Sequence, residues 1–192
     1  MKKLLIILAL FGLCACGMNN VETVKMTEVE TFPVDMSAYA NMNSVDHQFV
    51  GVKPTDFIDI VNNDGSALFY IGYSSCPICN EAVPLINQAA KELGLKVYYI
   101  DAYSETYPLI DYYDEFIEVI KPILKLRDGE PILYTPHVVA VKDGEFVADI
   151  IGLGKVDDLS TEKNYEKALN AYKDVMKYFD AEQVRIIEPF LL

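Results

Sequence analysis

The sequence has 192 residues, of which 52% are hydrophobic and 23% are charged. This length suits one domain with a core of its own, and the apolar content excludes a disordered chain. Sixteen Lys and Arg against 29 Asp and Glu give a net charge of −13. That excess argues against nucleic acid as a partner, because phosphate binding needs a basic patch. Four cysteines are too few for a disulfide scaffold of this length, so their spacing must carry the information.

The chain begins with the pattern of an export signal. Lys2 and Lys3 precede an apolar run over residues 4–13, after which small residues follow. This run is too short to cross a bilayer, which needs about 20 apolar residues, but it fits a secretory signal peptide. The alternative is a buried helix of the folded domain. Leu13–Cys14–Ala15–Cys16 resembles the lipobox of bacterial lipoproteins, which implies a signal peptide over residues 1–15 and lipidation of Cys16.

Lipidation would hold the chain at the outer face of the cytoplasmic membrane. Removing two of the 16 basic residues with the signal peptide leaves 14 against 29 acidic ones, a side-chain charge of −15. The lipid rather than charge would therefore provide the attachment. Residues 16–45 show no sustained helical or strand period, and we expect them to form a lipidated tether. The folded domain is then expected over residues 46–192.

From residue 46 onward the hydrophobic pattern predicts strands that alternate with helices. We expect a short strand at 47–52, a helix from Lys53 that stops at Asn63–Asp64–Gly65, a buried strand at 67–72, a helix after Cys79 that stops at Gly94, and a strand at 96–100.

The second half of the domain begins with a helical excursion over residues 104–127, in which Pro122 should break or kink the helix. A hairpin follows, with strands at 135–142 and 146–151 around the turn Lys142–Asp143–Gly144–Glu145. Residues 160–179 form a final amphipathic helix. This order predicts an α/β protein with a sheet of mixed direction.

The strongest chemical signal is the segment Cys76–Pro77–Ile78–Cys79, which directly follows a buried strand and begins a helix. The free N–H groups and partial positive charge of a helix start stabilise a thiolate, which is the reactive form of cysteine. The second cysteine can attack the mixed disulfide that the first forms with a substrate, which releases the product. We therefore predict that Cys76 is the attacking thiol and Cys79 the resolving thiol.

The spacing of the pair leaves three alternatives open. A permanent structural disulfide would close a very small loop and add little stability. A structural zinc site needs four ligands, and the sequence has no second cysteine pair and only two histidines, His47 and His137. Two buried, unpaired thiols would be inert. No metal or organic cofactor is implied, and no phosphate loop, hydrolase elbow or dinucleotide fingerprint is present in the sequence.

The pair and its surroundings resemble the thioredoxin superfamily. The matching features are the strand 69–75 before the pair, Pro84 in the helix after it, Thr135–Pro136 ahead of a strand, the Gly144 hairpin and the trailing Gly152. The resemblance implies a thioredoxin-like mixed sheet flanked by helices, with a helical insertion at about 104–130 before the proline strand. It also implies that Pro136 is cis and contacts the substrate, together with Pro77, Ile78 and Thr135.

Two positions depart from thioredoxin itself. Ser75 stands where thioredoxin has Trp, and Tyr70 stands where it has a buried acid that helps proton transfer to the second cysteine. These departures argue against efficient general thioredoxin-type reduction. Within the superfamily, residues 71–79 look most like bacteriocin-transport accessory-type thioredoxin-like proteins of Gram-positive bacteria.

We therefore expect a lipid-anchored extracytoplasmic thiol–disulfide oxidoreductase that acts on thiols or disulfides of exported proteins, with a membrane redox partner to reset it. The alternatives are an accessory module of a secretion system, in which the dithiol is secondary, and a thiol peroxidase. His137 either lies near the pair or is a surface histidine, and the second is favoured. The tyrosines at 98, 99, 107, 112 and 113 are expected to pack in the core and on helices.

Overall fold

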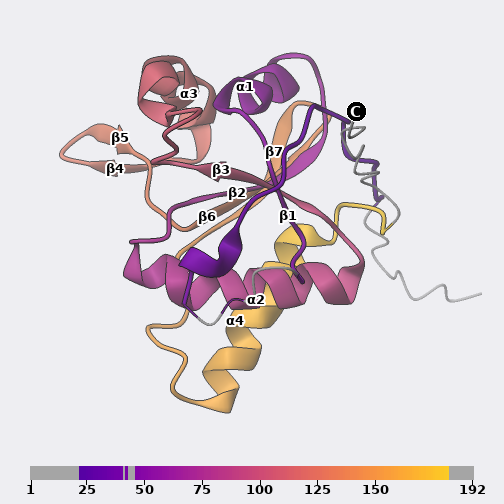
Figure 1. Cartoon of the computed structure of the whole chain (residues 1–192), viewed down its shortest axis with the longest axis vertical. Coiled ribbons are helices and arrows are strands. Elements are labelled where there is room, and N and C mark those ends of the chain that lie inside the picture. The colour runs from indigo at the N-terminus through magenta and orange to yellow at the C-terminus, as the bar shows by residue number, and fades with distance from the viewer. Residues whose placement is uncertain (1–21, 41, 43–45, 182–192) are drawn as a thin grey trace, which may run out of the picture.

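A computed structural model describes residues 22–40, 42 and 46–181 and contains a five-stranded sheet with the strand order β1-β3-β2-β6-β7 (Figure 1). Strands β1, β2 and β3 are parallel, whereas β6 runs antiparallel to β2, and β7 antiparallel to β6. The predicted mixed sheet is confirmed. The strands are β1 (Phe49–Gly51), β2 (Ala67–Gly72), β3 (Val97–Asp101), β6 (His137–Lys142) and β7 (Glu145–Ile151).

Helices cover both faces of this sheet. Figure 1 shows α1 and α3 above it and α2 and α4 below it. Phe57 of α1 packs between Phe69 of β2 and Phe116 of α3, with ring centroids 4.8 and 4.6 Å apart. Successive residues of a strand face opposite sides, so Tyr70 points to the other layer. The helices are α1 (Pro54–Asn62), α2 (Pro77–Leu93), α3 (Tyr113–Ile120) and α4 (Glu162–Met176).

The central elements begin and end where local chemistry predicts. All six residues of β2 are buried, as expected for a continuous apolar run. The Asp56 carboxylate accepts the Lys53 N–H at 2.7 Å and fixes the start of α1. Helix α2 ends at Gly94, which adopts the left-handed conformation with φ of 67°. It starts earlier than predicted, at Pro77, because proline is favoured at the first helical position.

The insertion between β3 and β6 is only partly helical. Short 3-10 turns flank α3, which ends two residues before Pro122 as predicted. A small hairpin of β4 (Lys125–Arg127) and β5 (Glu130–Ile132) follows, where a helical insertion to about residue 130 was expected. The turn residues Asp128 and Gly129 have φ of 55° and 89°, the conformation that an Asp-Gly hairpin turn requires. The Asp128–Gly129 dipeptide is the feature of the sequence that could have predicted this hairpin.

Residues 22–40 belong to the domain, which corrects the tether expected over residues 16–45. Phe32 and Gly51 exchange two backbone hydrogen bonds of 3.0 and 2.8 Å, so the segment extends the sheet at its β1 edge. Met36 and Tyr39 are buried in the core. These contacts are non-local and leave no period in the sequence. The signal peptide and Cys16 lie outside the described residues.

The last helix begins slightly later than predicted. Thr161 caps α4 by accepting the Asn164 N–H at 3.2 Å, and Tyr172 inside the helix is fully buried. Within the part of the chain that the structure describes, no helix has both the length and the apolar content to cross a membrane.

Candidate active site

The two cysteines lie at the junction of β2 and α2. A turn leads from Gly72 to Cys76, whose N–H donates to the Tyr73 carbonyl at 3.2 Å. Cys76 is the N-cap of α2 and Cys79 lies in its first turn. The two residues form a disulfide with their Cα atoms 5.1 Å apart. The fold therefore places the pair at the end of a rigid central strand.

The start of α2 directs a hydrogen-bond donor at the first sulfur. The Cys79 N–H points to Cys76 Sγ at 3.1 Å, so it can stabilise a negative charge there in the reduced state. Pro77 supplies no N–H. The Asn80 side-chain amide donates to the carbonyls of Ser74 and Cys76 at 2.6 and 3.0 Å, which fixes the turn before the pair.

Solvent reaches the two cysteines unequally. Cys76 is 5% exposed and Cys79 is 0% exposed, while Ile78 between them is 49% exposed. A substrate sulfur can therefore meet Cys76 first, and Cys79 is placed to act from within. The roles predicted from the spacing, attacking for Cys76 and resolving for Cys79, stay predictions.

A proline loop lies beside Cys76. The Thr135–Pro136 bond is cis, as the resemblance implied. The carbonyl oxygen and Oγ1 of Thr135 both lie 3.8 Å from Cys76 Sγ. The chain has the thioredoxin fold. This assignment rests on the strand order, on the cysteine pair at the start of α2 and on the cis-proline ahead of β6.

No protein-family model matches the chain. Similar solved structures include a thioredoxin from Trypanosoma brucei brucei, which is 16% identical over 71% of this chain and 98% of that chain, with a TM-score of 0.42. A thioredoxin from Aeropyrum pernix is 22% identical over 60% and 84%, with a TM-score of 0.38. Thioredoxin O2 from Arabidopsis thaliana is 17% identical over 55% and 84%, with a TM-score of 0.39.

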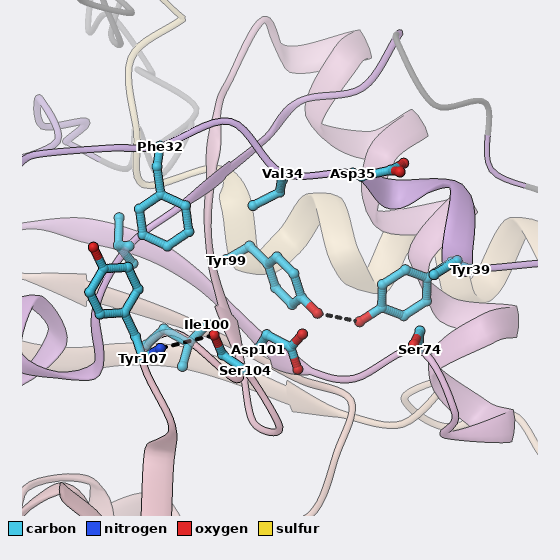
Figure 2. Close-up of a pocket in the computed structure, with 12 residues that line it drawn as sticks. Phe32, Val34, Asp35, Tyr39, Ser74, Tyr99, Ile100, Asp101, Ser104 and Tyr107 are labelled. Carbon is cyan, nitrogen blue, oxygen red and sulfur yellow. Dashed lines mark hydrogen bonds between the residues drawn. The ribbon is translucent and has the colours of Figure 1, made fainter. Parts of the chain in front are cut away.

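Three buried tyrosines, Tyr39, Tyr70 and Tyr99, form a hydroxyl cluster in the layer between the sheet and α2. The Tyr39 and Tyr99 hydroxyls are 2.8 Å apart (Figure 2), and Tyr70 donates to Tyr39 at 3.3 Å. The Tyr70 and Tyr99 rings stack with centroids 5.2 Å apart. Burial raises the pKa of Tyr39 to about 12 and raises the pKa of the other two as well. All three are therefore neutral hydroxyls at ordinary pH.

The sequence predicted that Tyr70 stands at the position of a buried acid, but it did not reveal its partners. Tyr39 comes from the segment that was expected to be a tether. Ala40, the next residue, donates its N–H to the side chain of Asn80, the residue that directly follows Cys79. The N-terminal segment therefore reaches the start of α2 and supplies one of the groups beneath it.

A cavity of about 160 Å³ adjoins the tyrosine cluster. Phe32, Tyr99 and Asp101 line it, and Figure 2 shows Ser104 beside Tyr107, whose N–H donates to Ser104 Oγ at 3.1 Å. Of the tyrosines predicted to pack, Tyr98 and Tyr99 are buried, and Tyr107 packs against Phe32 with ring centroids 5.2 Å apart. Tyr112 and Tyr113 are instead exposed, at 37% and 39%.

His137 is fully buried, so the favoured prediction of a surface histidine is wrong. It is the first residue of β6, directly after Pro136, and pairs with Ile71 of β2. Its Nε2 lies 2.9 Å from Asp149 Oδ2 on β7. β6 lies inside the sheet, between β2 and β7, and its first five residues are all buried, because helices cover both faces of the sheet there.

Proposed function

We propose that the protein is a lipid-anchored extracytoplasmic thiol–disulfide oxidoreductase that exchanges disulfides with exported proteins. The observation that carries the proposal is the Cys76–Cys79 disulfide at the start of α2, with the Thr135 carbonyl 3.8 Å from Cys76 Sγ. The exposed Ile78 and the cis-proline loop border the sulfur that a substrate meets first.

Exchange needs two displacements at sulfur. In the reducing direction the Cys76 thiolate attacks a substrate disulfide, forms a mixed disulfide and expels one substrate sulfur as a thiolate. The Cys79 thiol then releases its proton to solvent, and its thiolate attacks Cys76 Sγ, which re-forms the internal disulfide and expels the second substrate thiolate. Two electrons pass to the substrate, and solvent protonates the released thiolates. The oxidising direction is the reverse, and a membrane redox partner restores the starting state in either case.

Two features of the sequence support the location. The leader ends in a lipobox whose Cys16 would carry the lipid. An oxidising compartment outside the cytoplasm is where disulfides of exported proteins form and persist. The described domain begins by residue 22, so only a few residues would separate the domain from the lipid.

The experiment that tests the redox function compares the wild type with Cys76→Ser. We expect the wild type to reduce insulin disulfides or to oxidise a dithiol peptide, and the variant to lose both activities by at least about 100-fold, because the attacking sulfur is absent. Thermal unfolding provides the control for folding. If Cys76→Ser keeps the wild-type rate, the cysteine pair is not the reactive group, and the accessory role in a secretion system becomes the better account.

A further inference from the structure

An open groove of about 920 Å³ lies between β7 and α4. Its apolar surface comes from Ala148 and Ile150 of β7 and from Ala171, Val175 and Tyr178 on or just after α4. Four consecutive residues of β7, 148–151, line it. Because alternate side chains of a strand point to opposite faces, this lining means that the backbone edge of β7 runs along the groove.

That edge is open to pairing. In the strand order of the described sheet, β7 is the last strand and pairs only with β6. An edge strand presents unpaired N–H and C=O groups, which an extended peptide can use by adding a further strand. The groove therefore suits an extended polypeptide segment rather than a compact ligand.

The charge of the groove is opposite to that of the chain. Three acidic residues, Asp149, Glu166 and Asp174, line it together with five lysines, although the whole chain carries −13. We call the five lysines the lysine rim: Lys125, Lys155, Lys163, Lys167 and Lys177. Lys177 is paired with Asp174 at 3.4 Å, and the five lysines still outnumber the three carboxylates. This excess of positive charge beside apolar side chains fits a segment in which carboxylates alternate with apolar residues.

One end of the groove lies near the active site. Ile151 and Gly154 line it, and Gly152 between them donates its N–H to the Pro136 carbonyl at 2.9 Å. A Cβ at Gly152 would lie only 4.0 Å from Ile78 Cγ2. Lys125 belongs to the β4–β5 hairpin, which leads within three residues to Thr135. A chain held at Cys76 can therefore continue into the groove without leaving the surface.

We propose that this groove binds an extended acidic and apolar segment of the polypeptide whose cysteine reacts with Cys76. The inference rests on the proposed oxidoreductase function and adds a substrate preference to it. Pairing with the β7 edge would hold the segment extended, and the lysine rim would select carboxylates. The preference concerns protein substrates alone, because a small disulfide does not reach beyond Cys76.

The test uses two synthetic peptides with one cysteine each, linked to 2-mercaptoethanol as a mixed disulfide. One continues into an acidic and apolar tail, and the other has the same tail with lysine in place of each acid. The readout is the second-order rate constant for oxidation of the reduced protein. We expect the acidic peptide to react faster, and Lys155→Glu with Lys163→Glu to lower its rate constant about tenfold.

Two controls make the result specific. Lys121→Glu reverses the same kind of charge on the exposed end of α3, outside the groove, and should leave the preference intact. Hydroxyethyl disulfide is neutral and small, so its rate constant should be the same for all variants. Equal rates for the two peptides, or a groove variant that keeps the wild-type preference, would overturn the proposal. A wild type inert even to hydroxyethyl disulfide would overturn the redox function itself.

Discussion

The buried hydroxyl of Tyr70 is held by Tyr39 and lies against the ring of Tyr99, in the layer that α2 covers. A carboxyl at this position would be charged at neutral pH unless its pKa were strongly raised, whereas these hydroxyls are neutral and satisfy one another. The cluster therefore supports the start of α2 without a buried charge. Tyr70 stands where thioredoxin has its buried acid, so the two proteins differ at this position.

The tyrosine cluster predicts loss of stability in alkali. Because burial raises the pKa of Tyr39 to about 12 in the folded state and raises that of Tyr70 and Tyr99 too, the unfolded chain loses these protons first. The stabilisation is complete below the unfolded tyrosine pKa of about 10 and falls as pH rises toward the folded values. The slope is about 1.4 kcal/mol per pH unit for each tyrosine.

Tyr70→Phe should make this slope shallower between pH 10 and 11.5, since one titrating group is gone. Urea unfolding at a series of pH values measures the free energy of unfolding directly. At pH 8 the variant should lose only about 1 kcal/mol, because Tyr39 and Tyr99 still bond to each other. The same slope in Tyr70→Phe and wild type would show that Tyr70 does not stay protonated.

At the scale of elements, local signals predicted the regular parts well. The sequence predicts the buried strand β2, the end of α2 at Gly94 and the turn Asp143–Gly144 between β6 and β7. Each of these features depends on residues that are neighbours in the sequence. The β4–β5 hairpin was not predicted because its strands have only three residues each and none of these residues is buried, so they leave no sustained hydrophobic pattern. The burial of His137 was missed because it depends on the strands that flank β6.

The fold of the N-terminal segment is not predictable from the sequence for a related reason. Its structure depends on contacts with β1, β3 and the end of α4, which are distant in the sequence. Among the site residues, the cysteine pair and the cis-proline were predictable from motifs, whereas Tyr39 and the groove beside β7 needed the tertiary arrangement.

A substitution in residues 22–40 tests whether that segment is part of the domain. Met36 is 0% exposed, so Met36→Ala should lower the free energy of unfolding by about 2–5 kcal/mol through the cavity that it leaves. Lys25→Ala, at an exposed position of the same segment, should cost less than about 0.5 kcal/mol. Chemical denaturation of both variants provides the measurement. Equal, negligible losses would return the segment to the role of a tether.

At the scale of the whole molecule, three features of the proposed site lie on the neighbouring strands β2, β6 and β7. The carboxyl end of β2 presents the cysteine pair, the cis-proline precedes β6, and the groove follows the outer edge of β7. The net charge of −13 keeps most anionic partners at a distance. A local lysine rim in that field would select the acidic segments that can use the groove.

The measurement that tests the central claim most directly is the capture of mixed disulfides in intact cells with Cys79→Ala. Without the resolving sulfur, the adduct between Cys76 and its substrate should persist. We expect exported proteins to appear as adducts that a reductant releases, and the double variant with Cys76→Ser to capture none. If Cys79→Ala captured no more protein than the double variant, Cys76 would not exchange disulfides with exported proteins, and the central claim would be contradicted.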